Sequence, residues 1–566
     1  MTKRGAFTFV LHSHLPYARN AGKWPHGEEW LHEAIADTYL PILNALNELV
    51  DEGVPFRLTI GITPILAEQL SDPSIVENFI QYAAERAAWA SNDVERFEKA
   101  GNIENRDLAR FYHHWYARNL TNFTDRYNRD LIGAFRKLQD AGYIEIATSA
   151  ATHGYLPLLS RDSSIYGQIT TGADAYKARF GREAKAIWLP ECAYRPAYRD
   201  ESGPQPVDRP GLESFLAPKG LEVFFSETHT VEGGSPVGKA AGEAIGLYGA
   251  VTRRYKVAVT EESQATPGTT FRPYWVGDAP GQVAVLGRND RTGQQVWSGT
   301  YGYPGDFAYR EFHRKDDVSG LQYWRIGGSD VDLGQKPLYD PAIASAQVEG
   351  HARHFADLVQ KLLNDFAYDT DTYGVISSAY DTELFGHWWF EGAEWLKLVL
   401  RDLAASDSVD LLSASEIIEQ HPPDRVLALP ESSWGAGGGH FTWLNADTEW
   451  MWPVIHKAEV AMEALVAAHP SATGIQQRVL NQAARELLLV QSSDWPFLVT
   501  TGQAREYAIE RFTGHVDRFE RLSGMADAGG NLSAEDETFL RDVEFNDNPF
   551  ANVDYRNFAA RQGRAD

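Results

Sequence analysis

Apolar, strand-forming runs alternate with helical segments between residues 5 and 380, and this alternation constrains the fold more than any other feature of the chain. Helical periodicity separates the runs, for example at residues 28–50, 165–180 and 345–367. Such alternation is typical of a parallel sheet with helices packed on its faces. We therefore expect an α/β barrel or a large open sheet, with strands near residues 5–11, 56–64, 142–150, 184–190, 221–227, 282–287 and 373–380.

Two regions interrupt this pattern and predict a division into three units. Residues 72–126 are polar, lack strand-like runs and show helical periodicity, which indicates an inserted helical domain. Beyond residue 420 the strand-like runs end, and helices follow up to a last one that Ser533 would cap. The predicted units are a discontinuous α/β barrel at residues 1–71 and 127–420, the helical insertion, and a C-terminal helical domain at residues 421–566.

The chain carries 52 basic and 78 acidic residues, and the resulting formal charge of −26 limits what it can bind. Proteins that follow nucleic acid or anionic membranes need a basic face, so both are poor partners here. The single cysteine excludes a disulfide within the chain and is typical of a reducing compartment. The first apolar stretch is too short for a signal peptide, and no run of about 18 apolar residues occurs, so we expect a soluble cytoplasmic protein.

Two histidines, His12 and His14, end the first strand-like run, FTFVLHSHLPY. Alternate side chains of a strand share a face, so both imidazoles should point the same way. In an α/β barrel the C-terminal ends of the strands carry the active site. The pair therefore predicts contact with substrate hydroxyl groups or ligation of a metal, although hydrogen bonds to the backbone would also satisfy it.

A glutamate and the only cysteine, Glu191 and Cys192, stand side by side at the end of another apolar run, IWLPECAY. If this run is a strand, Glu191 shares a face with Ile187 and Leu189, and Cys192 faces away. A buried, unpaired carboxylate costs several kcal/mol or stays protonated, which makes a purely structural role costly. A cysteine needs a basic neighbour to become a nucleophile, and a lone one is usually inert. The pattern therefore favours Glu191.

A second carboxylate, Asp381, follows the last strand-like run in SSAYDTELFGHWWFEG and would share a strand face with Ser377 and Ala379. Taken alone, Asp381 could equally be the N-cap of a helix that opens near Glu383. Together with Glu191 it forms the smallest set that can break a glycosidic bond, for which retaining enzymes hold two carboxyl groups about 5–5.5 Å apart. Only the fold can bring these two residues together.

Aromatic residues form the fourth group of candidates. Trp434 and Trp443 bracket a glycine-rich stretch in ESSWGAGGGHFTWLN, where core packing is a poor explanation for an indole. An indole face can stack on a sugar ring. Trp30 and Trp297 could do the same, although each could also serve packing alone.

Five segments in order resemble the motifs of glycoside hydrolase family 57, and within it those of the 1,4-α-glucan branching enzymes. They are HSHLPY, SAATHGYLP, IWLPECAY, YDTELFGHWWFEG and SWGAGGGHFTWLN, and the resemblance covers essentially the whole chain. It implies an incomplete (β/α)7 barrel with a helical insertion and a C-terminal helical domain that contributes to the substrate groove.

The resemblance also implies roles for single residues. Glu191 would be the nucleophile of a retaining mechanism and Asp381 the general acid/base, an allocation that the residues alone leave open. Tyr248, in the glycine-rich stretch 232–250, is the candidate for a tyrosine that covers the active site. No metal or cofactor is expected. The other candidate substrate-binding residues are His12, His14, Trp30, His153, Arg291, Trp297, Trp434, Trp443 and Asp494.

The expected activity is cleavage of α-1,4 linkages in a glucan donor and formation of α-1,6 branches on a glucan acceptor. Hydrolysis by an α-amylase, or transfer that gives only α-1,4 products, stays open within the family. The residues are also compatible with a metal-dependent polysaccharide deacetylase that uses His12, His14, His153 and an aspartate, and with a non-catalytic glucan-binding protein. The presence of both carboxylates argues against the non-catalytic protein.

Overall fold

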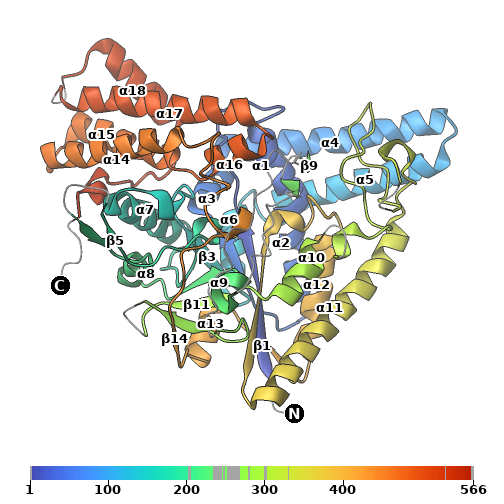
Figure 1. Ribbon diagram of the computed structural model, residues 1–566. Helices are drawn as coiled ribbons and strands as arrows, with labels where there is room; N and C mark the ends of the chain where they lie inside the picture. Colours follow the sequence, from blue (N-terminus) through green and yellow to red (C-terminus); the bar gives the residue numbers. More distant parts are fainter. Residues whose placement is uncertain are drawn as a thin grey trace.

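The computed structural model of the chain describes residues 3–201, 206–233, 245–246, 249–250, 268–277, 281–298, 302–328, 331–528 and 531–561. Tyr248 lies outside the described residues. One large sheet at the centre, long helices around it and a helical C-terminal region make up the molecule (Figure 1).

Among the described residues, seven strands of the main sheet form a continuous parallel series in the order β12-β1-β2-β3-β4-β7-β11. Three short strands complete the sheet: β13 (Val409–Leu411) pairs with β1, and β10 (Tyr274–Val276) and β14 (Val426–Leu427) extend it beyond β11. Each predicted strand is present. The parallel strands are β1 (Gly5–Ser13), β2 (Leu58–Ile62), β3 (Ile144–Ser149), β4 (Ala186–Trp188), β7 (Val223–Ser226), β11 (Ala284–Gly287) and β12 (Gly374–Asp381).

The sheet curls until its two outer parallel strands, β11 and β12, meet. Arg288, directly after β11, forms an isolated parallel bridge with Ser377 of β12, and the N–H of Asn289 donates to the carbonyl of Ser377 at 2.9 Å. The pairing between β11 and β12 involves far fewer residues than the pairing between β12 and β1, which runs from Gly374 to Asp381. The sheet is therefore an incomplete (β/α)7 barrel, as predicted.

Helices cover the outside of the barrel, and every residue of β1 and β2 is buried as a result. Strands buried on both faces are apolar along their length rather than alternating, which explains runs such as AFTFVL. The helices of this unit are α1 (Glu28–Ala34), the π-helical turn Ile35–Tyr39, α2 (Leu40–Asp51), α3 (Pro64–Leu70), α6 (Leu131–Asp140), α7 (Asp162–Phe180), α8 (Glu213–Leu216), α9 (Thr228–Glu232), α10 (Asp290–Trp297), α11 (Pro341–Thr370), α12 (Gly392–Ala404) and α13 (Ala414–Gln420).

Two small antiparallel hairpins lie outside the main sheet. They are β5 (Tyr198–Asp200) with β6 (Val207–Arg209), and β8 (Ile245–Gly246) with β9 (Gly249–Ala250).

Two long helices, α4 (Pro73–Lys99) and α5 (Ile103–Thr121), form a hairpin that projects from the barrel in Figure 1. The side chain of Asp72 accepts N–H bonds at the start of α4, and Asn102 does the same for α5, so both ends carry the N-caps that favour helix initiation. The hydroxyl of Tyr323 donates to Asp93 at 2.7 Å and ties the hairpin to the segment before α11. These helices occupy the range predicted to be helical, while the domain boundaries stay a prediction.

The C-terminal region contains α14 (Met451–Ala468), α15 (Gly474–Val490), α16 (Asp494–Thr501), α17 (Arg505–Ala526) and α18 (Ala534–Asn546). Ser533 caps α18 as predicted, because its hydroxyl accepts from the N–H of Asp536 at 3.1 Å. Buried leucines of α15, with Met462 and Phe519, form a second apolar cluster beside the barrel core.

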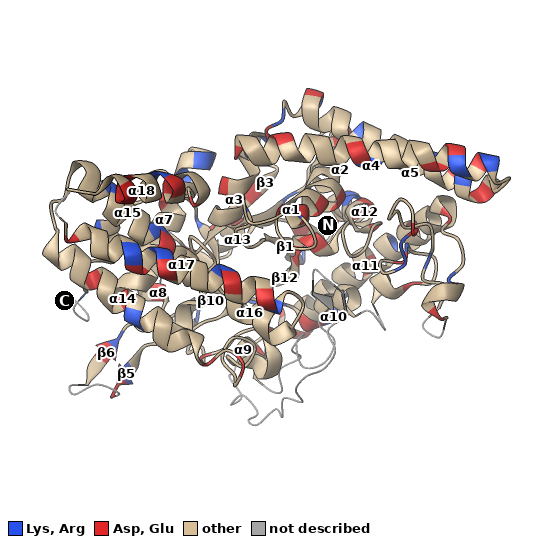
Figure 2. Ribbon diagram, turned by 90° about the horizontal axis from the view of Figure 1, so that it is seen from above, with Lys and Arg blue, Asp and Glu red and all other residues tan. Residues whose placement is uncertain are grey.

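Charged residues of both signs are interspersed along α4, α5 and α17 (Figure 2). These helices therefore carry acidic and basic residues side by side rather than acidic residues alone. Among the helices that the structure describes, none is long and apolar enough to span a membrane.

Candidate active site

Four segments meet where the parallel strands end. In the register of β1 and β12, His12 lies opposite Asp381, the last residue of β12. On the other side, His12 pairs with Gly61 of β2, where a Cβ would lie 3.3 Å from the carbonyl of Leu11. The C-terminal edge of the barrel thus carries both a predicted histidine and a predicted carboxylate, at the edge where barrel enzymes keep their active sites.

The structure corrects the expected local conformation of Glu191. Strand β4 ends at Trp188, and Pro190–Cys192 form a 3-10 turn in which Glu191 has φ 63° and Cys192 has φ 50°. The prediction that Glu191 shares a strand face with Ile187 was therefore wrong. Left-handed backbone costs a non-glycine residue about 1–3 kcal/mol and persists only where its surroundings hold it. Here the N–H of Trp434 donates to the carbonyl of Glu191 at 3.1 Å.

The Glu191 carboxylate is buried and accepts a hydrogen bond at each oxygen. The indole Nε1 of Trp434 donates to Oε2 at 2.6 Å, and the hydroxyl of Ser493 donates to Oε1 at 3.0 Å. Burial raises the pKa of Glu191 to about 7; the Trp434 bond opposes this, and the negative charges of Asp494 and Asp381 add to it. The charge of Asp381 contributes to this rise, and both carboxylates lie at or just after strand ends at the same edge of the barrel.

Three histidines stack beside this carboxylate. The ring of His12 lies 4.5 Å from that of Trp188 and 5.0 Å from that of His153, and His153 in turn lies 3.9 Å from His14. Although burial disfavours the charged form, the carboxylate of Asp494, 3.0 Å from Nε2, raises the pKa of His14. Burial lowers the pKa of His153 well below its ordinary value, and the nearby His14 adds to the effect.

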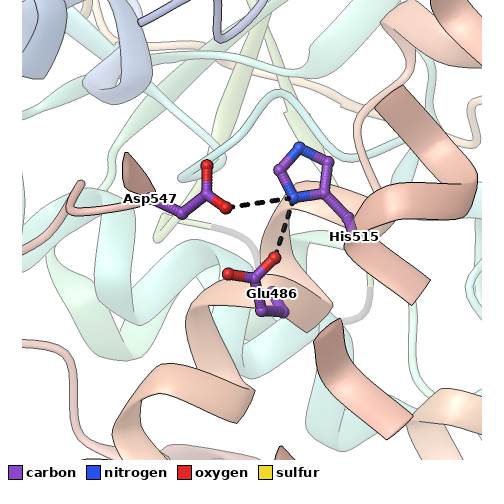
Figure 3. Close-up of side chains that lie close together, drawn as sticks. All are labelled: Glu486, His515 and Asp547. Atoms are coloured by element: carbon purple, nitrogen blue, oxygen red, sulfur yellow. Dashed lines mark hydrogen bonds and ion pairs between the residues drawn. The ribbon is translucent and has the colours of Figure 1, made fainter. Parts of the chain in front are cut away.

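These histidines do not form the metal cluster that a deacetylase would need. Within the described part of the chain, one trio of His, Cys, Asp and Glu residues has all its ligand atoms within 4.8 Å of one another, and it consists of Glu486, His515 and Asp547 in the C-terminal helices (Figure 3). The two carboxylates of that trio already form ion pairs with a guanidinium, because Arg518 Nε lies 2.9 Å from Asp547 and 3.2 Å from Glu486. The deacetylase hypothesis therefore lacks its constellation.

Asp381 is not a helix cap. The segment that follows it, Thr382–Leu384, is a 3-10 turn to which the Asp381 side chain gives no capping hydrogen bond, and α12 begins only at Gly392. A helical turn does open near Glu383, as predicted, but it is a three-residue 3-10 turn and not the start of a longer helix. The Asp381 side chain is half-buried at the end of its strand, as expected for a group that must reach substrate.

A third carboxyl group that sequence reasoning missed, Glu383, lies beneath this site. It is buried; the hydroxyl of Tyr39 and the backbone N–H of His14 donate to its Oε1, the latter at 3.3 Å. Burial raises its pKa to about 7, and the charge of Asp381 adds to the rise. One feature of the sequence could have indicated Glu383 as a site residue: it lies two residues after Asp381, directly beyond the end of a strand.

The tryptophans hold different positions. Trp434 directs its N–H edge at Glu191 and crosses His12 edge-on at 6.2 Å, while Trp443 is fully buried and stacks on Tyr155 at 4.3 Å. The glycine-rich stretch between them allows this packing, since a Cβ on Gly435 would lie 2.5 Å from the Trp443 ring. Trp443 therefore packs in the core, contrary to the expectation from the glycine-rich sequence, whereas Trp434 also contacts Glu191.

The remaining candidates surround the core of the site at different distances. Trp30 meets Tyr507 of α17 edge-on at 5.2 Å, and Trp297 lies 6.4 Å from Tyr380, the neighbour of Asp381. Arg291 is exposed on α10, and no described contact joins it to Glu191 or Asp381. Tyr248 is outside the described residues.

Asp494 and the missed residue Ser493 come from the C-terminal region and complete the site. Ser493 precedes α16 in the N-cap position, and in sequence QSSDWP suggests only a helix start. Its side chain makes no capping bond and instead contacts Glu191, 302 positions away. No local pattern could show this contact.

Known proteins resemble this chain over most of its length. Residues 8–430 match the model of glycosyl hydrolase family 57, which is more than half of the chain. The chain belongs to this family. Residues 454–558 match a second model, described as the C-terminal part of 1,4-alpha-glucan branching enzyme.

Relatives of known structure match this family member over nearly its whole length. A 1,4-alpha-glucan branching enzyme of Thermococcus kodakarensis is 45% identical over 552 residues, covering 97% of this chain and 78% of the relative. Its crystal structure superposes with a TM-score of 0.88 at 43% identity, over 99% of this chain and 97% of that one. A branching enzyme of Pyrococcus horikoshii gives 0.86 at 39% identity, over 99% and 98%. The alpha-amylase AmyC of Thermotoga maritima gives 0.80 at 30% identity, over 99% of both chains.

Proposed function

We propose that the chain is a 1,4-α-glucan branching enzyme that works by retaining double displacement on Glu191 and Asp381. The observation that carries this is the buried Glu191 carboxylate, held by two neutral donors and sensing the charge of Asp381. A pair of carboxyl groups in one site is what a retaining glycosidase needs. The C-terminal match and the 45% identical branching enzyme favour branching over other activities of the family.

The first step cleaves an α-1,4 linkage of the donor glucan. Glu191 attacks the anomeric carbon, and Asp381 gives its proton to the departing O4, so that a glycosyl ester forms while the glucan remnant leaves. We assign the nucleophile to Glu191 because Trp434 and Ser493 fix both of its oxygens. Asp381, half-buried at the strand end, is the group better placed to exchange protons.

The second step transfers the glycosyl group. Asp381, now ionised, removes the proton from a 6-hydroxyl of the acceptor glucan; the oxygen attacks the anomeric carbon and releases Glu191, leaving an α-1,6 branch. Water competes for the same ester, so exclusion of water decides between transfer and hydrolysis. We place Tyr248 at this step as a residue that covers the site, and the other predicted binding residues along the donor and acceptor chains.

The partners in this proposal are donor and acceptor α-glucan chains, and neither metal nor cofactor takes part. Neutral glucans suit a chain with a strong net negative charge, because they carry no phosphate that the charge would repel. We place the enzyme in the cytoplasm, where a lone buried thiol such as Cys192 stays reduced.

Incubation with amylose tests the proposal. Branching should lower the iodine staining while producing side chains that isoamylase releases. Loss of staining with reducing ends but no releasable side chains would contradict it.

An α-amylase is the second candidate, because the amylase AmyC shares the fold over 99% of both chains. The same digestion separates the two activities. An amylase raises the number of reducing ends before isoamylase is added, whereas with a branching enzyme the number rises only when isoamylase cuts the new branches.

A further inference from the structure

We propose that Ser493 is a positioning residue for Glu191, whose hydroxyl relays a hydrogen bond from His153 to the carboxylate and keeps it ionised. This inference rests on the proposed role of Glu191. It means that the C-terminal helical region completes the nucleophile rather than only covering the glucan.

The Ser493 hydroxyl lies between the carboxylate of Glu191 and the imidazole of His153. Its Oγ lies 3.0 Å from Glu191 Oε1 and 2.9 Å from His153 Nδ1, and both Ser493 and His153 are only 1% exposed. The backbone fixes the serine as well: its N–H donates to the carbonyl of His153 at 3.1 Å, and the adjacent Ser492 forms an antiparallel bridge with Gly154. The hydroxyl therefore has one well-defined position.

The chemistry of the three groups fixes the direction of the relay. An ionised carboxylate can only accept, so the single hydroxyl proton of Ser493 goes to Glu191. The serine oxygen must then accept from His153, which places the ring proton on Nδ1. A neutral ring has a lone pair on the other nitrogen, and His153 Nε2 is buried without a hydrogen-bond partner among the described residues. A sugar hydroxyl is the group that this nitrogen would accept from.

The relay follows a substrate contact through to the nucleophile. When a glucan hydroxyl donates a hydrogen bond to Nε2 of His153, the hydrogen bonds in the chain polarise one another. The bond from Nδ1–H to Ser493 and the bond from Ser493 to Glu191 are then both strengthened. The low pKa of His153, caused first by burial, keeps the ring neutral as this arrangement requires. His153 would thereby report substrate occupancy to Glu191.

Glu191 needs such donors because of the charges around it. The titratable groups that face it are Asp381 of β12, Asp494 of α16, His14 after β1, and His153 and Tyr155 after β3. Burial and the two aspartates favour the protonated, unreactive acid, whereas hydrogen bonds to the ion favour the nucleophile. Loss of one hydrogen bond to the ionised carboxylate should therefore raise its pKa by about one unit or more.

The test compares Ser493→Ala with Ser493→Thr and a matched control in the full-length protein. Ser163→Ala is that control, since its buried hydroxyl donates to Glu463 at 2.6 Å and also joins the barrel to the C-terminal helices, but away from Glu191. For each variant, kcat and KM for amylose consumption are measured against pH, together with the melting temperature. Consumption counts hydrolysis and transfer alike, so the test keeps its meaning if branching itself is disproved.

In Ser493→Ala, we expect the acidic limb of the pH profile of kcat/KM to move to higher pH by about one unit. At pH values below that limb, kcat/KM should fall approximately tenfold, through a lower kcat rather than a higher KM. Ser493→Thr should restore the limb because it keeps the hydroxyl, and Ser163→Ala should leave it unchanged while lowering the melting temperature. A folded Ser493→Ala with the wild-type limb would overturn the proposal, as would an equal shift in Ser163→Ala. Should the alanine variant not fold, Ser493→Cys, a near-isosteric weak donor, takes its place, and a wild-type limb there overturns the proposal too.

Discussion

Two buried clusters of carboxylates and imidazoles within the described part of the chain differ in the groups that contact their carboxylates. In the C-terminal region, Glu486, His515 and Asp547 lie close together (Figure 3). The guanidinium of Arg518 lies within 3.2 Å of both carboxylates. At the barrel edge, Glu191 accepts from an indole and a hydroxyl, and no lysine or arginine among the described residues forms an ion pair with it.

This difference is the one we expect between a structural cluster and the proposed reactive one. An arginine is charged at every relevant pH, so it fixes the charge of its partners and joins three segments of chain. A neutral donor holds a carboxylate in place without fixing its charge. A nucleophile that must exchange its negative charge for a covalent bond, and regain it later, needs the second arrangement.

Removing the carboxylates would test this comparison most strongly. Glu191→Gln and Asp381→Asn should each lower turnover of amylose by at least about 10³-fold, because each removes a group that forms or breaks a bond in the transition state. Both variants should fold, since the Gln side chain needs no charge in a site that already disfavours one. The measurement is the rate of staining loss with amylose, alongside circular dichroism. Near-normal turnover in either folded variant would remove that residue from the pair.

The structural cluster should show the reverse behaviour. Arg518→Met leaves two buried carboxylates without their cation, and breaking such a pair costs about 3 kcal/mol of unfolding free energy. Activity per folded molecule at 25 °C should be unchanged. Lys457→Met is the control, because its ion pair with Glu520 is exposed and contributes less than about 1 kcal/mol. Denaturant titration measures both variants; equal losses would mean that the cluster is not what stabilises this region.

Sequence reasoning placed His12 and Asp381 at strand ends, where the structure also has them, and it made no prediction about the cluster of Glu486, His515 and Asp547. The strand ends at His12 and Asp381 follow from alternation and barrel geometry, and the motif around Glu191 is local. Ser493 and Glu383 were missed because their function depends on partners far away in the chain, and Ser493 looks like an ordinary cap. The backbone of Glu191 was mispredicted because Pro190 ends the strand in a turn with positive φ, which strand alternation cannot anticipate.

The pH dependence of stability sharpens the comparison further. The pKa of Glu191 is about 7 in the folded protein and near the ordinary 4.5 when unfolded, so the folded state binds the extra proton. The stability contributed by this proton is complete below pH 4.5 and is lost as pH rises through 7, by about 3 kcal/mol in total. Glu191→Gln lacks this loss. Its unfolding free energy relative to wild type should therefore rise between pH 5 and 8, which chemical denaturation at several pH values would detect; a constant difference would mean that Glu191 ionises normally.

The smallest expected effect distinguishes two adjacent residues of one turn. Cys192 is buried beside Glu191, shares its positive φ and packs in the apolar core of the barrel. A buried structural cysteine is inert, so Cys192→Ser should keep most of the activity and lose only the stability that a buried hydroxyl costs, about 1–2 kcal/mol. Assays before and after treatment of wild type with a thiol reagent provide the second measurement, because a buried structural cysteine reacts only when the protein opens. Complete loss of turnover in a folded Cys192→Ser variant would make the thiol the nucleophile and leave Glu191 as its neighbour.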